Sequence, residues 1–107
     1  MVKPGSKERK ANILINGLEL KELQCFDWMM AESFGLDRRI ANYKGTYPIG
    51  LWRWDLECLV DVIDAVLDDP ELYPSKGSPG YQAIKALRDR LQKEAVIITA
   101  ELQTLRW

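Results

Sequence analysis

The sequence contains no histidine, and this absence excludes several common kinds of active site. Without an imidazole there is no Ser-His or Cys-His nucleophile pair, no imidazole proton shuttle and no mixed cysteine and histidine zinc site. The only cysteines, Cys25 and Cys58, lack CxxC spacing, and two thiolates cannot complete a tetrahedral zinc site. We therefore expect each cysteine to be a small buried hydrophobic residue, and we predict neither a cofactor nor a metal.

Long apolar runs are also missing. No stretch approaches the roughly 20 residues that a membrane-spanning helix needs, and residues 1–10 are not followed by the apolar block of a signal peptide. We therefore expect a cytoplasmic chain with no membrane partner. With 107 residues, 47% of them apolar and 29% charged, the chain has the size and composition of one globular domain.

The charges are divided between segments. Residues 1–10 carry four cations against one acid and almost nothing apolar, so we expect a mobile basic arm there and a single helical domain over residues 11–107. Seven acids and no Lys or Arg lie between Asp55 and Glu71. A net charge of -1 argues against a general nucleic-acid coat, because such binding depends on Lys and Arg that neutralise phosphates.

The periodicity of the apolar residues predicts a mainly α fold, a small domain of three helices. The first runs from about Leu18 to Phe34, with Gly35 as its left-handed C-terminal cap. The preceding segment allows two interpretations. We favour an extended stretch at residues 13–15 that leads into the helix, with Asn16 as N-cap and Glu19 as its capping-box partner. The alternative is a hairpin at Asn16-Gly17, a typical turn dipeptide.

Two further helices follow from start and stop signals. One begins after Gly50 and ends at Pro70. The last begins at Pro79 with Ser78 as its cap, and no helix breaker occurs before the chain ends. It should therefore be a long amphipathic helix that extends beyond its shorter partners. Because its apolar seam exceeds what they can cover, we predict a homodimer. The predicted interface residues are Leu91, Ala95, Ile98, Leu102 and Leu105.

The segment from residue 38 to residue 54 combines basic and aromatic side chains around a loop with Gly and Pro. Tyr, Trp and Arg dominate binding hot spots, because they bury a large area and also offer a polar group. We predict a partner-binding surface there, made of Arg38, Arg39, Tyr43, Lys44, Tyr47, Trp52, Arg53 and Trp54. The structural alternative is that the tryptophans close one end of the core while the arginines are solvated.

Carboxylates form a second pattern. Spacings of 4, 3 and 4 residues place four acids on one face of the second helix: Glu57, Asp61, Asp64 and Asp68. Solvation, pairing with Lys85 or Arg88 of the last helix, and a bound cation all remain open. A less favoured alternative sets Glu19 and Glu22 opposite Asp61 and Asp64, as in Mg²⁺-dependent helical nucleotide hydrolases.

These patterns favour binding over catalysis. We predict a non-catalytic adaptor or regulatory module that binds a protein partner of unknown identity through the 38–54 surface. The same surface allows an alternative, in which bases stack on its aromatic rings while its cations hold phosphates of a nucleic acid or another phosphate ligand. No motif in the chain indicates a known family.

Overall fold

The structure, a computed structural model of the chain, describes residues 10–30 and 35–104, with side chains up to Glu101. The predicted arm over residues 1–10 lies, except for Lys10, outside the described residues. Along the chain the elements are β1 (Ala11–Ile13), α1 (Gly17–Gln24), η1 (Asp27–Met30, a 3₁₀ helix), α2 (Leu36–Asn42), β2 (Ile49–Leu51), α3 (Arg53–Leu67) and α4 (Pro79–Thr104). The fold is mainly helical with a long C-terminal helix, as the sequence predicts.

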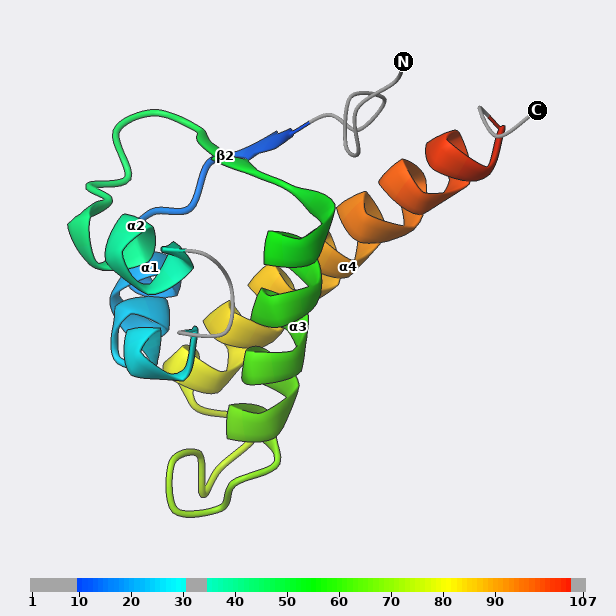
Figure 1. Cartoon of the computed structure of the whole chain (residues 1–107). Helices are drawn as coiled ribbons and strands as arrows, with labels where there is room; N and C mark the ends of the chain where they lie inside the picture. Colours follow the sequence, from blue (N-terminus) through cyan, green and yellow to red (C-terminus); the bar gives the residue numbers. More distant parts are fainter. Residues whose placement is uncertain (1–9, 31–34, 105–107) are drawn as a thin grey trace.

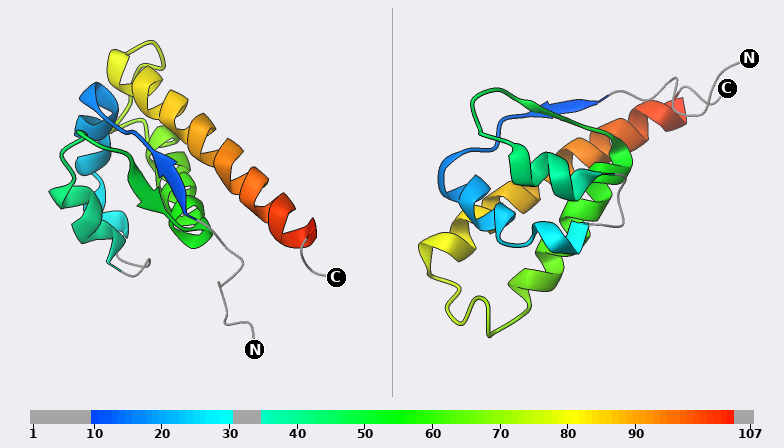
Figure 2. Two further views of the ribbon diagram at one scale, coloured as in Figure 1. Left: turned by 90° about the horizontal axis from the view of Figure 1, so that it is seen from above. Right: turned by 60° about the vertical axis from the view of Figure 1, so that its left-hand side comes forward.

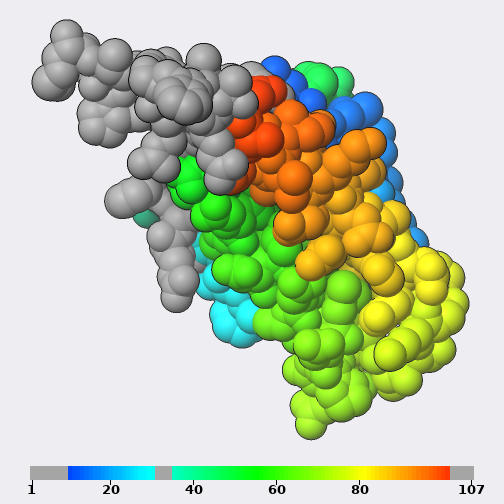
Figure 3. All heavy atoms as spheres, turned by 90° about the vertical axis from the view of Figure 1, so that its right-hand side faces the viewer, coloured from blue at the N-terminus to red at the C-terminus, as the bar shows by residue number. Residues whose placement is uncertain are grey.

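Helices α3 and α4 form an antiparallel pair at the centre of the molecule (Figure 1). Seen from one side, the spheres of α3 and α4 lie against each other along their shared length (Figure 3). The core between and around them contains fully buried leucine and isoleucine side chains at helical spacing: Leu56, Leu59, Ile63, Ile84, Leu87 and Leu91. Burial of one such side chain stabilises the fold by roughly 1.5–3 kcal/mol, so this pair contributes a large part of the stability.

Local signals explain where these two helices begin and end. The Ser78 hydroxyl accepts the Tyr81 amide at 3.3 Å, and Pro79 occupies the first turn, where no amide is needed. Helix α4 then continues unbroken to Thr104, which confirms the predicted rod. In α3, the Asp55 carboxylate accepts the Trp52 amide at 3.0 Å and so caps the first turn. Helix α3 ends at Leu67, three residues before Pro70.

Strands β1 and β2 pair as a two-stranded antiparallel sheet, which brings the segment before α1 next to the segment before α3. Ala11 pairs with Leu51 and Ile13 with Ile49, and the strands lie side by side in Figure 2. The predicted extended segment is therefore real but begins two residues earlier, at Ala11. The hairpin at Asn16-Gly17 does not form, because β1 pairs with a strand more than thirty residues away and α1 begins at Gly17.

The predicted first helix is wrong beyond Gln24. The Cys25 amide bonds to the Glu22 carbonyl at 3.1 Å and the Phe26 amide to Leu23 at 3.0 Å, so the chain tightens into 3₁₀ geometry. Phe26 and Met30 remain buried in this tighter path. Apolar residues that recur every three or four positions fit an α-helix and a 3₁₀ helix equally well. Periodicity alone therefore does not reveal that the α-helix ends at Gln24. Residues 31–34 lie outside the described part of the chain.

Other local expectations are corrected in the same region. Asn16 precedes α1 without a side-chain cap bond, and the Glu19 carboxylate pairs with Arg90 of α4 at 2.8 Å. Gly35 has the expected positive φ of 71°, but it stands at the start of α2, a helix that the sequence does not predict. Cys25 is exposed rather than buried, whereas Cys58 is partly buried against the core.

Tyr73 fastens the loop between α3 and α4. Its hydroxyl donates to Glu22 Oε1 at 2.7 Å, and its ring packs edge-on against Phe26 and Tyr81, with centroids 6.1 and 5.9 Å away. Burial of the phenol and its bond to the Glu22 carboxylate both raise the pKa of Tyr73 well above its usual value. The neutral phenol is therefore the form that the folded state stabilises.

This shift predicts a loss of stability at alkaline pH. Because the folded pKa lies above the unfolded one, the contribution of Tyr73 is complete below about pH 10 and declines as the pH rises further. Between about pH 9 and 11, urea denaturation of wild type should lose on the order of 1 kcal/mol more than that of Tyr73→Phe. Tyr47→Phe, at an exposed tyrosine, is the control, and it should lose stability between these pH values as wild type does. Equal slopes for wild type and Tyr73→Phe would contradict this linkage.

Candidate functional site

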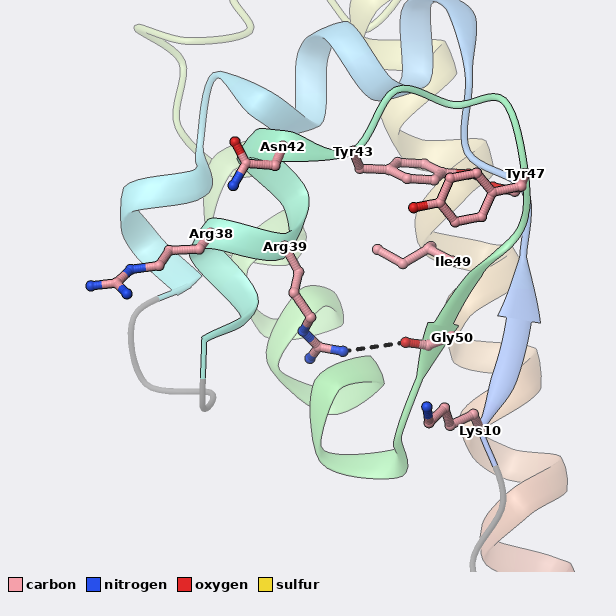
Figure 4. Close-up of a pocket in the computed structure, with 8 residues that line it drawn as sticks. All are labelled: Lys10, Arg38, Arg39, Asn42, Tyr43, Tyr47, Ile49 and Gly50. Carbon is pink, nitrogen blue, oxygen red and sulfur yellow. Dashed lines mark hydrogen bonds between the residues drawn. The ribbon is translucent and has the colours of Figure 1, made fainter.

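A surface hollow of about 450 Å³ lies between α2 and β2 (Figure 4). Its lining comes from α2, from the loop that follows it, from β2 and from the residue before β1: Lys10, Arg38, Arg39, Asn42, Tyr43, Tyr47, Ile49 and Gly50. Pockets of 300–1,000 Å³ are the usual size for ligand sites. Part of the predicted 38–54 surface thus lines a shallow hollow that is open to solvent.

Arg39 and Asp55 form the polar support of this hollow. Arg39 Nη2 lies 2.7 Å from Asp55 Oδ2, and Nη1 donates to the Gly50 carbonyl at 3.3 Å. The Asp55 side chain has an exposed fraction of 0%. One guanidinium therefore connects α2 to β2 and to the first turn of α3, and its charge is compensated by a carboxylate behind the hollow.

Two tyrosines close the other end of the hollow. Tyr43 is buried, its oxygen accepts the Ile15 amide at 3.4 Å, and its hydroxyl donates to the Tyr47 carbonyl. The two rings meet edge to face with centroids 5.7 Å apart. Tyr47 remains 61% exposed. Tyr43 thus holds the loop in place, whereas the Tyr47 ring remains open to solvent.

The tryptophans lie beside the hollow rather than in its lining. Trp52 and Trp54 stack with centroids 5.4 Å apart at 16°, and Lys10 Nζ lies 5.4 Å from the centre of the Trp52 ring. This cation–π contact draws the lysine towards the hollow. Arg53 pairs with Glu57 at 3.2 Å, and Lys44 is exposed outside the lining.

The hollow therefore joins Arg38, Arg39, Tyr43 and Tyr47 of the predicted surface and leaves Trp52, Arg53, Trp54 and Lys44 around it. Sequence reasoning misses the other lining residues. Asn42 stands four residues after Arg38, on the same face of α2, which is a detectable signal once that helix is known. Lys10 joins the site only through the pairing of β1 with β2, for which the sequence offers no local signal.

The acidic face of α3 is partly paired. The Arg88 guanidinium contacts Asp64 at 2.8 Å and 3.3 Å, and these bonds raise the pKa of Arg88. This confirms one of the pairings considered from sequence, whereas Lys85 turns to Asp89 of its own helix. Asp61 and Asp68 are exposed.

The carboxylates considered for a magnesium site have separate partners. Glu19 binds Arg90, Glu22 accepts the Tyr73 hydroxyl, and Asp64 binds Arg88. Over residues 10–30 and 35–101, no cluster of three or more acidic, cysteine or histidine side chains is arranged to hold a metal ion. Glu19, Glu22 and Asp64 thus connect neighbouring elements of the fold, whereas Asp61 is exposed.

The residues predicted for a dimer interface are partly covered within one chain. Leu91, Ala95 and Ile98 are buried in the single chain, while the Leu102 side chain and Leu105 lie outside what the structure describes. Among the α4 side chains that the structure describes, the large apolar ones left exposed are Val96 and Ile97, with exposed fractions of 55% and 37%. Val96 borders a second hollow of about 310 Å³ between α3 and α4. The homodimer stays a prediction.

Comparison of the chain with protein-family models, with curated proteins and with solved structures finds no match. Among the described helices, none combines the length and apolar character needed to cross a membrane. The structure is that of a small, mainly helical domain, and basic and aromatic side chains line the hollow between α2 and β2.

Proposed function

We propose that the chain is a small non-catalytic module, of adaptor or regulatory type, that binds a protein partner through the α2–β2 surface. By this name we mean the lining of the 450 Å³ hollow together with Trp52 and Trp54 at its side. The observation that carries the proposal is the hollow itself, in which an exposed Tyr47 and the cations Lys10 and Arg38 surround a concavity. Concave surfaces with aromatic and arginine side chains are typical of binding hot spots.

The supporting contacts favour a pre-organised binding surface. Arg39 is fixed by Asp55 and by the Gly50 carbonyl, and Tyr43 is fixed by its two backbone partners. Side chains that are already held lose less conformational entropy when a partner binds. The ionisable side chains that line the hollow are the cations Lys10, Arg38 and Arg39 and the phenols Tyr43 and Tyr47, so we propose recognition and not a reaction.

We further propose that the chain acts in the cytoplasm. Cys25 exposes its thiol at the end of α1, and exposed thiols persist in a reducing compartment. The proposed homodimer would use the apolar surface around Val96 on α4, beside the second hollow, whose lining residues differ from those of the α2–β2 hollow.

Site-specific photo-crosslinking tests the binding proposal. A photoreactive phenylalanine analogue replaces Tyr47 in the hollow or, as control, Leu72 in the loop after α3, which is 46% exposed. In an extract of cells that produce the chain, we expect a discrete adduct from position 47 and none of that size from position 72. Excess unlabelled wild type should compete for it, whereas a Tyr47→Ala, Trp54→Ala double variant should not. Identical adducts from both positions, or none from position 47, would refute the surface.

A further inference from the structure

Resting on the proposed function, we propose that the hollow between α2 and β2 recognises a short acidic segment of the partner in extended conformation. Every charged side chain that lines it is a cation. Arg39 is neutralised by Asp55 at 2.7 Å, but among the described residues neither Lys10 nor Arg38 contacts a carboxylate. Within the described part of the chain these two cations have no carboxylate partner, and charge-assisted hydrogen bonds from them to an acidic occupant would be strong ones.

The two uncompensated cations stand on opposite sides of the hollow. Arg38 belongs to α2, whereas Lys10 precedes β1 and lies beyond β2, as Figure 4 shows. Figure 4 shows the Arg38 guanidinium pointing away from β2 and Gly50, on the outer side of α2, whereas the Lys10 side chain lies close to Gly50. An occupant that meets both cations must carry negative charge at more than one point. This requirement fits several Asp or Glu side chains along an extended chain better than a single compact anion.

Gly50 leaves room for the Lys10 side chain at the base of the hollow. A Cβ built at this position would lie 2.8 Å from Lys10 Cδ, so the lysine stem crosses the strand only because residue 50 has no side chain. The Gly50 carbonyl points towards α2 and away from β1 (Figure 4). With Ile49 and the Tyr47 ring beside it, the floor offers apolar contact as well as charge. A peptide that alternates acidic and apolar side chains matches both features.

The surroundings favour a peptide over a nucleic acid. Base recognition on single strands depends on several open aromatic faces, but Trp54 already stacks on Trp52, and Tyr47 is the exposed ring of the hollow. Helix α3 begins two residues after β2 and carries Glu57 and Asp61 on its exposed side. The seven acids between Asp55 and Glu71 would repel a long polyanion more strongly than a short acidic segment.

Selection from a random peptide library tests this assignment. The purified chain is used to select peptides displayed on phage, and enriched peptides are then labelled with fluorescein and measured by anisotropy. We expect enrichment of Asp and Glu over the starting library. Arg38→Glu and Lys10→Glu should each weaken a selected peptide by about tenfold or more. Lys76→Glu, the same charge change on the loop after α3, should leave binding unchanged.

A labelled single-stranded oligothymidine is measured beside the peptide over a range of salt concentrations. The peptide should bind more tightly and with the shallower salt dependence, since only two uncompensated cations are involved. Tighter binding of the oligonucleotide, selection without acidic enrichment, or equal losses for Lys76→Glu and Arg38→Glu would overturn the proposal. If position 47 still crosslinks to a protein in that case, the binding surface stands and only the acidic preference fails.

Discussion

Replacing Asp55 with alanine is expected to lower the free energy of unfolding by about 3 kcal/mol. The carboxylate is fully buried, caps α3 through the Trp52 amide and holds Arg39 at 2.7 Å. Its removal takes away an N-terminal cap, worth about 1 kcal/mol, and leaves the Arg39 cation without its partner. Because Arg39 retains access to solvent, the loss should fall at the low end of the range for broken buried pairs.

Urea denaturation followed by circular dichroism measures this loss, and Asp61→Ala provides the matched control. Asp61 lies on the same helix but is exposed, so its replacement should change stability little. Asp55→Asn should fall between them, because an amide oxygen still accepts the Trp52 amide but no longer carries charge. A loss below about 1 kcal/mol for Asp55→Ala would show that the buried pair does not support the fold.

The Asp55 pair also illustrates the limit of sequence reasoning about the site. Arg38 and Arg39 are neighbours in the chain and look equivalent there. On α2 they point in directions about 100° apart, so one reaches a buried carboxylate and the other remains at the rim. Because the sequence does not predict α2, it cannot distinguish the structural arginine from the one available to a partner.

The α3/α4 pair is the part of the fold that the sequence predicts well. Its apolar stripes are long, and Ser78, Pro79 and Pro70 mark its boundaries, so local information is sufficient. One long-range contact also follows from spacing, since Arg88 does meet Asp64. The sequence also predicts that the last helix is longer than its partner, and α4 does continue past α3 (Figure 1).

The N-terminal half is less predictable because its elements are short and depend on distant partners. Each strand has three residues, and Ala11–Ile13 becomes a strand through pairing with Ile49–Leu51. Helix α2 has seven residues, and its last turn is completed by Gln24, whose amide donates to the Ile40 and Tyr43 carbonyls at 3.0 Å. No local pattern encodes these contacts, and they are the ones that form the hollow.

Gly45 is the residue whose substitution should most directly test this long-range assembly. We expect Gly45→Ala to lower the free energy of unfolding by about 3 kcal/mol. The residue has a φ of 75°, which L-residues adopt only under strain. A Cβ there would lie 3.0 Å from the Ile15 carbonyl oxygen, 3.1 Å from Asn16 Cβ and 3.1 Å from Leu20 Cδ2. Backbone strain and crowding therefore act together at the point where the loop after α2 crosses the start of α1.

Gly17→Ala separates these two causes. Gly17 also has a positive φ, of 59°, but a Cβ there meets no atom within 4 Å. Its replacement should therefore cost only the backbone strain, about 1 kcal/mol by urea denaturation. Gly45→Ala should in addition weaken crosslinking from position 47, because displacement of the loop moves the Tyr47 carbonyl from the Tyr43 hydroxyl that holds it. Equal losses for the two variants would mean that the loop yields freely and that Gly45 does not position the α2–β2 surface.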